Sequence, residues 1–347
     1  MAQIDSVLQM AVKSRASDVH IASGAQFGVR HFGKLKPVRS PIITVETAEK
    51  LLFEILSPAQ LKTLEQNLQL DFSYEIDGIA RFRGNAIRQR RGLDITFRVI
   101  PLKVPDFDEL CVPQVVKKFC DFHQGIILVT GATGQGKTTT MAAMIDYINA
   151  RRPVHILTVE DPIEFVHPIK KGVVNQRQLG AHTLSFANAL RAALREDPDV
   201  IMVGELRDLD TIRLAVSAAE TGHLVIGTLA TSSAPKTVDR IIDSFPPDEQ
   251  NQIRAMLAGS LRAVVTQRLL PRADGKGLAL ACEIMIGTVP VSNLIRTERT
   301  FQLKSIMQTG RAQGMLAMDD AIDDLLRAGI VDKRTARFWA ENKKRFA

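Results

Sequence analysis

A glycine-rich stretch near the middle of this 347-residue chain has the residue types and spacing of a phosphate-binding loop. It reads Gly-Ala-Thr-Gly-Gln-Gly-Lys-Thr over residues 131–138, after the apolar run 126–130 and before a segment of helix-forming residues. Glycines let backbone N–H groups curl around a phosphate, and the N-terminus of the next helix adds partial positive charge. Lys137 would reach the β- and γ-phosphates of a nucleotide, and the Thr138 hydroxyl would bind Mg²⁺.

The pattern therefore predicts a P-loop, and the strand–loop–helix context argues against a glycine turn without a ligand. The residues predicted to bind nucleotide are Gly131, Ala132, Thr133, Gly134, Gln135, Gly136, Lys137, Thr138 and Thr139.

Acidic residues follow two other apolar runs. Glu160, Asp161 and Glu164 come at and after the run 156–159, and the ends of such strands point toward the ligand crevice of a parallel sheet. Carboxylates there suit Mg²⁺ coordination or polarisation of an attacking water, although a solvated turn explains this segment equally well by itself. The run 200–203 leads into Glu205 and resembles a Walker B strand, with glycine at the usual aspartate position.

Glu205 is expected beside the P-loop, where it would hold the metal or its waters; a surface glutamate is the alternative. His223 precedes another apolar run and could sense the γ-phosphate, although a lone histidine is more often structural. Arginines gather between residues 81 and 98. They form either a solvated basic face or arginine fingers that stabilise phosphate charge.

Composition limits the classes of function. The formal charge of +7 indicates an anionic partner such as nucleotide, acidic protein or anionic lipid, or simply a basic surface. Aromatic residues make up only 5%, too few for platforms that stack single-stranded nucleic acid. Three scattered cysteines form neither a disulfide framework nor a zinc pair, and no signal peptide or membrane-spanning run is recognisable, so a cytoplasmic protein is expected.

The periodicity of apolar residues divides the chain. Residues 1–100 read as a small α+β domain with helices at 5–14 and 46–67 and strands at 18–21, 27–32, 72–76, 80–83 and 94–100. The proline-punctuated segment 101–113 is the predicted linker. In residues 114–347, four apolar strands (126–130, 156–159, 200–203 and 224–228) alternate with helices, which indicates a parallel sheet. Residues after 248 read as mostly helical, with a short β-like insertion near 278–287.

Several long motifs in order resemble the secretion-type ATPases of the type IV pilus machinery, in particular the twitching-motility retraction motors (PilT-type). The resemblance covers nearly the whole chain. Its motifs are Ala16-Ser-Asp-Val-His20, Arg81-Phe-Arg-Gly-Asn85, Gln89-Arg-Arg-Gly92, Phe97-Arg-Val-Ile-Pro101, the P-loop, the acidic box 159–167, the Walker B strand, the His box at Thr221-Gly-His223, and the segment 231–243.

This resemblance implies an α/β fold, with a RecA-like P-loop ATPase core and a smaller PAS-like α+β N-terminal domain. It implies a homohexameric ring at the cytoplasmic face of the inner membrane that hydrolyses ATP with Mg²⁺. Domain rotation would act on the inner-membrane platform protein and draw pilin subunits out of the filament. No specific nucleic acid is expected as a partner.

The resemblance also implies roles for single residues. Lys137 and Thr138 would bind ATP and Mg²⁺, and Glu164 would be the catalytic glutamate that activates water. Glu205 would be the Walker B acid and a metal ligand, and His223 the first His-box residue. Arg83 and Arg98 would approach the phosphates when the domains close.

The sequence departs from the family pattern at three places. Ala230 stands where the His box usually carries a second histidine, which bears on the hydrolytic rate or on coupling between subunits. Pro290-Val-Ser-Asn-Leu-Ile295 replaces a motif that begins Ala-Ile-Arg, which indicates a specialised or accessory retraction paralogue. Gln135 occupies a P-loop position that is often serine.

Three alternatives stay open. A pilus-assembly or type II secretion ATPase would commonly carry a tetracysteine zinc module and a longer N-terminal region. A low-turnover nucleotide-binding ring subunit would account for Ala230. A motor that pulls on DNA would account for the basic charge, and would show steeply salt-dependent DNA binding.

Overall fold

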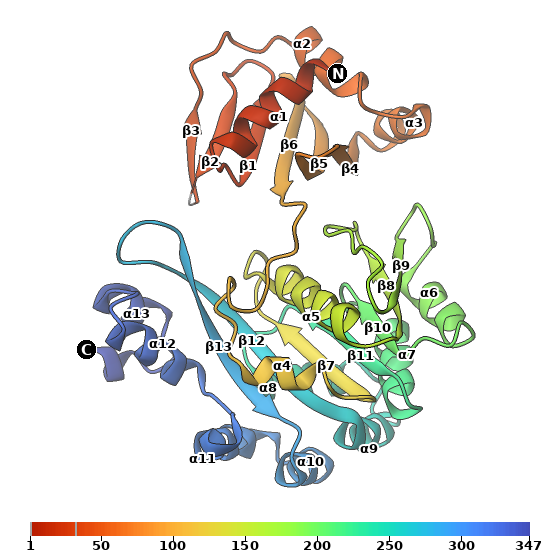
Figure 1. Cartoon of the computed structure of the whole chain (residues 1–347), viewed down its shortest axis with the longest axis vertical. Coiled ribbons are helices and arrows are strands. Elements are labelled where there is room, and N and C mark those ends of the chain that lie inside the picture. The colour runs from red at the N-terminus through yellow and green to blue at the C-terminus, as the bar shows by residue number, and fades with distance from the viewer. Residues whose placement is uncertain (1, 32) are drawn as a thin grey trace. The chain divides into compact units, whose positions relative to one another are not determined.

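The computed structural model describes residues 2–31 and 33–347. The chain forms two compact units. The first consists of Met1–Lys103 together with Pro162–Val166, and the second of Val104–Asp161 and His167–Ala347 (Figure 1). The division after Lys103 falls inside the segment 101–113 that the prolines single out.

The first unit is an antiparallel sheet covered by helices. Its strands, in spatial order, are β3 (Lys34–Pro37), β2 (Gly28–His31), β1 (Asp18–Ala22), β6 (Gly92–Ile100), β5 (Ala80–Gln89) and β4 (Gln69–Ile76). The helices α1 (Gln3–Lys13), α2 (Val45–Phe53) and α3 (Pro58–Asn67) share one apolar core with the sheet. The expected strand 27–32 corresponds to β2, and its last residue, Phe32, lies outside the described residues.

The helix predicted over 46–67 is wrong as a single element, because the structure has two helices there. Ser57 caps α3: its hydroxyl accepts a bond from the Gln60 N–H, and the Gln60 side chain accepts one from the Ser57 N–H. Pro58 is the first residue of α3, where its missing N–H costs nothing. A proline inside one continuous helix would have removed a hydrogen bond, so the chain ends one helix and starts another.

Three phenylalanine rings fill the centre of this core. Phe97 is fully buried and meets Phe72 and Phe82 edge to face, with ring centroids 5.8 Å and 6.4 Å away. Gly84 lies opposite Phe72 in the β4–β5 ladder, and a Cβ at Gly84 would overlap the Phe72 ring. The glycine therefore makes room for the aromatic ring across the strand pair.

The second unit contains a seven-stranded sheet, and the prediction of an α/β fold with a parallel sheet is confirmed. Its strands, in spatial order, are β13 (Leu278–Ile286), β12 (Leu261–Pro271), β7 (Gly125–Thr130), β11 (Leu224–Leu229), β10 (Val200–Val203), β8 (His155–Glu160) and β9 (Val173–Gln178). All neighbouring pairs are parallel except β12 with β13.

Helices cover both faces of this sheet. On β7, Ile127 and Val129 pack with α4 (Val115–Phe119) and α5 (Lys137–Arg151), while Ile126 and Leu128 face the other core. That other core includes α6 (Phe186–Ala193), α7 (Leu209–Glu220), α8 (Ala234–Asp243), α9 (Gln250–Ser260), α10 (Val289–Arg296) and α11 (Leu303–Thr309). Strands buried on both faces account for the continuous apolar runs in the sequence.

The C-terminal part adds α12 (Met318–Arg327), α13 (Lys333–Trp339) and the short 3₁₀ helices η1 (Thr300–Gln302), η2 (Gly310–Gln313) and η3 (Lys343–Phe346). Within the described part of the chain, no helix has the length and apolar character needed to cross a bilayer.

The expectation of a mostly helical region after residue 248 is wrong for residues 261–271. These residues form β12, which lies between β13 and β7 in the sheet. Strand β9 was not predicted either. Helix α9 ends at Ser260 and β12 begins at Leu261, so no turn residues mark the boundary. The run Val264-Val265-Thr266 has the β-branched composition of a strand and is the signal that could have identified it.

We expect Gly84→Ala to destabilise the first unit by about 2 kcal/mol, because the added methyl group displaces the Phe72 ring from a filled core. Thermal unfolding followed by circular dichroism and limited proteolysis of the first unit would measure the loss. The matched control is Gly259→Ala in α9, where no described atom lies within 4 Å of an added Cβ. Equal stability of the two variants would contradict this view of the core.

Candidate nucleotide-binding site

The glycine-rich loop connects β7 to α5 and is shaped by left-handed backbone angles. Gly131, Gly134 and Gly136 have φ values of 141°, 79° and 80°, which residues with side chains rarely adopt. A Cβ at Gly131 would also lie 2.6 Å from the Gln267 carbonyl oxygen. These glycines are therefore required by backbone conformation and, at Gly131, by a close approach of another strand.

The N-terminus of α5 is open to an anion. Its N-cap is Gly136, no described side chain caps the first turn, and that turn carries no acidic residue. Unbonded N–H groups and the helix dipole together favour a phosphate at this position. Ala132, Thr133 and Gly134 are exposed at the rim of the loop, and Thr138 and Thr139 are partly buried in the first turn of the helix.

Lys137 folds back over the loop. Its Nζ donates hydrogen bonds to the carbonyl oxygens of Gly131 at 2.9 Å and Ala132 at 3.1 Å. Partial burial lowers the pKa of Lys137, and the nearby Glu205 carboxylate opposes that shift. The ammonium group is thus held at the loop by weak acceptors that phosphate oxygens could replace.

Glu205 follows β10 and lies at the same edge of the sheet as the loop, because β10 and β7 run parallel to β11 between them. Its Oε2 lies 2.6 Å from Nη2 of Arg207, and this hydrogen bond raises the pKa of the Arg207 guanidinium. The negative charge of Asp161 adds to that rise. Arg207, which belongs to none of the predicted site residues, thus places a second cation beside the predicted metal ligand.

Glu160 ends β8 at the same edge, but its side chain is buried and bound by protein donors. The Thr158 hydroxyl donates to Glu160 Oε1 at 2.6 Å, and Gln176 Nε2 donates to the same oxygen at 3.0 Å. A carboxylate oxygen held in this way is poorly placed to accept a proton from water. Asp161, the next residue, is exposed.

Glu164 belongs to the first unit, together with the arginines of β5 and β6. Arg83 Nη1 lies 3.8 Å from Glu164 Oε1, and Arg98 Nε donates to Asp18 Oδ1 at 3.0 Å. Burial raises the pKa of Glu164, while the positive charges of Arg83 and Arg98 oppose the rise. A partly buried carboxylate with a raised pKa suits the role of a general base.

His223 does not lie where the sequence analysis expected it to sense a γ-phosphate. Its backbone oxygen accepts a hydrogen bond from the Gly125 N–H at the start of β7, whereas the loop follows the end of β7. Six residues of β11 at about 3.3 Å each separate the two edges by about 20 Å. The Nδ1–H of His223 bonds to the Ala218 carbonyl at the end of α7, which is a structural role.

Ala230 instead follows the last residue of β11 and is exposed at the edge of the loop. Leu229 pairs with Thr130, the residue before Gly131. The side chain at position 230 therefore lies at the edge of the sheet where the glycine-rich loop begins. In this chain that side chain is the methyl group of alanine.

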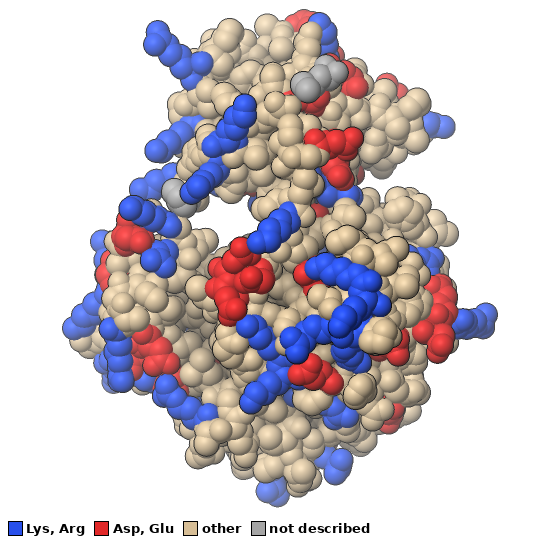
Figure 2. Space-filling model, viewed as in Figure 1, with Lys and Arg blue, Asp and Glu red and all other residues tan. Residues whose placement is uncertain are grey.

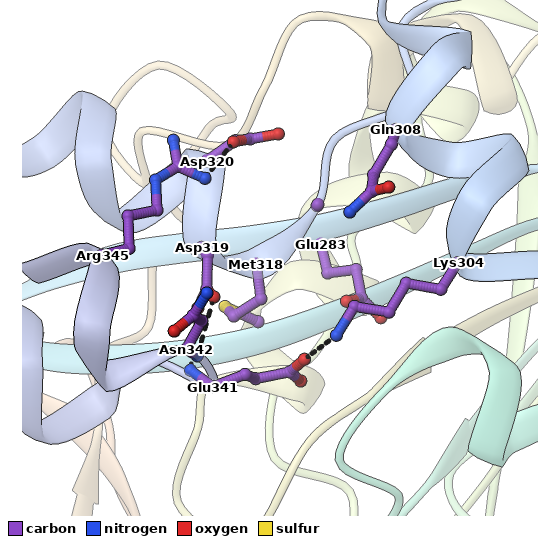
Figure 3. A pocket seen from close by; sticks show the side chains of 10 residues that line it. Glu283, Lys304, Gln308, Met318, Asp319, Asp320, Glu341, Asn342 and Arg345 are labelled. Carbon is purple, nitrogen blue, oxygen red and sulfur yellow. Dashed lines mark hydrogen bonds and ion pairs between the residues drawn. The ribbon is translucent and has the colours of Figure 1, made fainter.

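A separate pocket of about 520 Å³ lies among the C-terminal elements (Figure 3). Its lining includes Glu283, Lys304, Asp319, Glu341 and Arg345, and none of the predicted nucleotide-binding residues. Lys304 donates to Glu341 at 2.8 Å, and Asp319 accepts the backbone N–H groups of Glu341 and Asn342. The two cations of this lining, Lys304 and Arg345, therefore already pair with carboxylates of the pocket, Glu341 and Asp320.

Basic residues are also visible outside the loop. Figure 2 shows Lys and Arg side chains gathered on one face of the second unit, around α4 and α5. Exposed residues on these helices include Lys118 and Arg151. Part of the positive charge in the composition thus stands on the surface of the second unit.

Comparisons with known proteins agree with this geometry. A family model described as Type II/IV secretion system protein matches residues 1–330. The type IV pilus retraction ATPase PilT of Pseudomonas aeruginosa is 46% identical over 343 residues, with 99% of each chain covered. A twitching motility protein of Neisseria gonorrhoeae is 49% identical over 316 residues, which is 91% of this chain and 84% of that protein.

A crystal structure of the pilus retraction motor PilT and bound ADP matches with a TM-score of 0.90 at 42% identity, and the match covers 99% of this chain and 98% of that one. The chain therefore belongs to the type II/IV secretion family of ATPases, as a retraction ATPase of the PilT type.

Proposed function

We propose that this retraction ATPase works as a homohexameric ring in which ATP is bound at the loop 131–138 and drives the removal of pilin subunits from a type IV pilus. The observation that carries the proposal is the arrangement of Lys137, whose ammonium group lies against loop carbonyls at the open N-terminus of α5 with Glu205 nearby. This arrangement suits a triphosphate, because it offers N–H donors and a mobile cation.

The first part of the proposal concerns the nucleotide and its metal. Backbone N–H groups of residues 131–139 bind the phosphates, and Lys137 exchanges its loop carbonyls for phosphate oxygens. The Thr138 hydroxyl and the Glu205 carboxylate are hard oxygen donors of the kind that Mg²⁺ prefers, and both belong to the same edge of the sheet. When bound, Mg²⁺ neutralises part of the phosphate charge.

The second part concerns hydrolysis. Glu164 accepts a proton from the attacking water, and Arg83 and Arg98 supply positive charge that stabilises the phosphates in the transition state. The 3.8 Å separation of Arg83 and Glu164 supports a shared role. A phosphate that attracts Arg83 would weaken this pair and leave the carboxylate free to act on water.

The third part concerns the assembly. Residues 1–100 act as a PAS-like module and residues 114–347 as the ATPase module, with 101–113 as the hinge between them. Rotation of one module against the other during hydrolysis is the motion that acts on the inner-membrane platform protein. The ring works at the cytoplasmic face of that membrane, to which its partners hold it.

Lys137→Ala should lower phosphate release from ATP at least about hundredfold, because it removes the cation that compensates charge on the transferred phosphate. A coupled phosphate-release assay measures the rate, and circular dichroism checks that the fold is kept. Lys118→Ala, on the exposed face of α4, is the control and should keep the native rate. Unimpaired hydrolysis by the Lys137 variant would rule out this loop as the nucleotide site.

Glu164→Gln should keep nucleotide binding and lose about 10²–10⁴-fold in turnover, because the amide cannot accept the proton of water. Equilibrium binding of a fluorescent ATP analogue and phosphate release would be measured on the same preparation. Normal turnover in this variant would show that another carboxylate, and not Glu164, is the base. Glu160→Gln tests the nearest alternative, Glu160.

Arg83→Ala should slow hydrolysis by about 10³-fold and also move the acidic limb of the pH–rate profile to higher pH. Arg83 opposes the burial-driven rise in the pKa of Glu164, so its removal raises that pKa further. The base then becomes protonated at a higher pH as the solution is acidified. Arg88→Ala, on the same strand and paired with Glu49, is the control. An unchanged acidic limb of the pH–rate profile would show that Arg83 does not influence the pKa of the catalytic base.

A further inference from the structure

Strand β12 continues past the end of its neighbour β7. The two strands pair as far as Thr266 and Thr130, after which β7 turns into the nucleotide-binding loop. Residues 267–271 of β12 still pair with β13 on their other side. The loop therefore occupies the place beside β12 where a longer β7 would otherwise have paired.

Three contacts join this part of β12 to the loop and to α5. The hydroxyls of Thr130 and Thr266 lie 2.9 Å apart, and Gln267 Nε2 donates to the Thr140 hydroxyl at 2.7 Å; both contacts are buried. The third contact comes from the loop itself. The Leu269 N–H donates to Oε1 of Gln135 at 2.5 Å.

Gln135 thus provides the acceptor that a strand neighbour would have provided. Without β7 beside it, the partly buried Leu269 N–H needs a partner, because an unpaired backbone donor in such a place is unfavourable. Serine, the residue often found at this position of the motif, has a side chain shorter by two bonds and does not reach as far from the same Cα. The glutamine side chain therefore reaches the Leu269 N–H from its place in the loop.

The strand that receives this bond is itself held firmly. Arg268, the residue before Leu269, donates to the carbonyl oxygen of Trp339 at 2.7 Å and lies 3.2 Å from a Glu341 carboxylate oxygen. Its guanidinium also donates to the Ser232 carbonyl at 3.3 Å. Leu270, the residue after Leu269, is fully buried. Gln135 therefore ties the loop to a fixed point of the fold.

We propose that Gln135 is a positioning residue that holds the nucleotide-binding loop in its phosphate-ready shape through the backbone of β12. The loop contains glycines at positions 131, 134 and 136, which gain much conformational freedom when the loop is released. Gln135 lies between two of them. Holding the loop before nucleotide arrives reduces the ordering cost of binding, so the bond acts on affinity rather than on the chemical step.

The proposal rests on nucleotide binding at this loop. The test below distinguishes failure of the role of Gln135 from failure of nucleotide binding itself. The main variant is Gln135→Met, which has a similar length and volume but no acceptor for the Leu269 N–H. The probe is a fluorescent ADP derivative with Mg²⁺, used on the full-length assembled protein. The steady-state KM and kcat for ATP and the amide hydrogen exchange of residues 267–270 complete the measurement.

For Gln135→Met we expect the Kd for the ADP probe and the KM for ATP to rise about tenfold, the effect of one lost hydrogen bond. We expect kcat to stay within about twofold of the native value. Exchange of the 267–270 amides should become faster without nucleotide and return toward the native rate with it. Gln135→Glu, which keeps an acceptor oxygen at the same place, should retain slow exchange.

Gln124→Met, an exposed glutamine before β7, is the matched control and should behave as the native protein. Unchanged Kd and KM in Gln135→Met would overturn the proposal, as would weaker binding without faster exchange at 267–270. If Gln135→Met does not fold, Gln135→Ser supplies the same comparison. Failure of the native protein to bind the probe would instead refute the nucleotide site itself.

Discussion

The structure of the second unit depends on the parallel arrangement of β7, β8, β10 and β11. The carboxyl ends of parallel strands lie at the same edge of the sheet. Residues that are far apart in the sequence therefore lie close together at that edge. The loop 131–136, Glu160, Glu205 and Ala230 all follow or end these strands. At this edge the open N-terminus of α5 provides unbonded backbone N–H donors, which suit a phosphate.

A flexible loop at such an edge needs support from outside itself, and β12 provides it. The close approach of the Gln267 carbonyl to Gly131 excludes any side chain at that glycine. The Thr130–Thr266 and Gln267–Thr140 contacts hold both ends of the loop region against the same strand. Because Arg268 binds the C-terminal segment through Trp339 and Glu341, the strand that supports the glycine-rich loop is also connected to the end of the chain.

The first unit has a different architecture and a different electrostatic character. Its antiparallel sheet places Arg83 and Arg98 opposite each other on β5 and β6, and Glu164 lies close enough to feel both charges. For a partly buried carboxylate near two guanidinium groups, burial raises the pKa and the two positive charges lower it. The balance leaves the pKa raised, which is the direction a base near neutral pH requires.

The sequence by itself determined the glycine-rich loop between a strand and a helix, the apolar strands of the parallel sheet and the acidic residues after them. These features depend on local spacing and on continuous burial of the strands. The sequence did not determine strand β12, because no turn residues precede its first residue. It also did not determine the break between helices α2 and α3 before Pro58. Only the tertiary structure showed that His223 and Ala230 lie at opposite edges of the sheet and that Gln135 binds a backbone group 134 residues away. These positions depend on the order of the strands in the sheet and on β12 extending beyond the end of β7. Neither property produces a local pattern in the sequence.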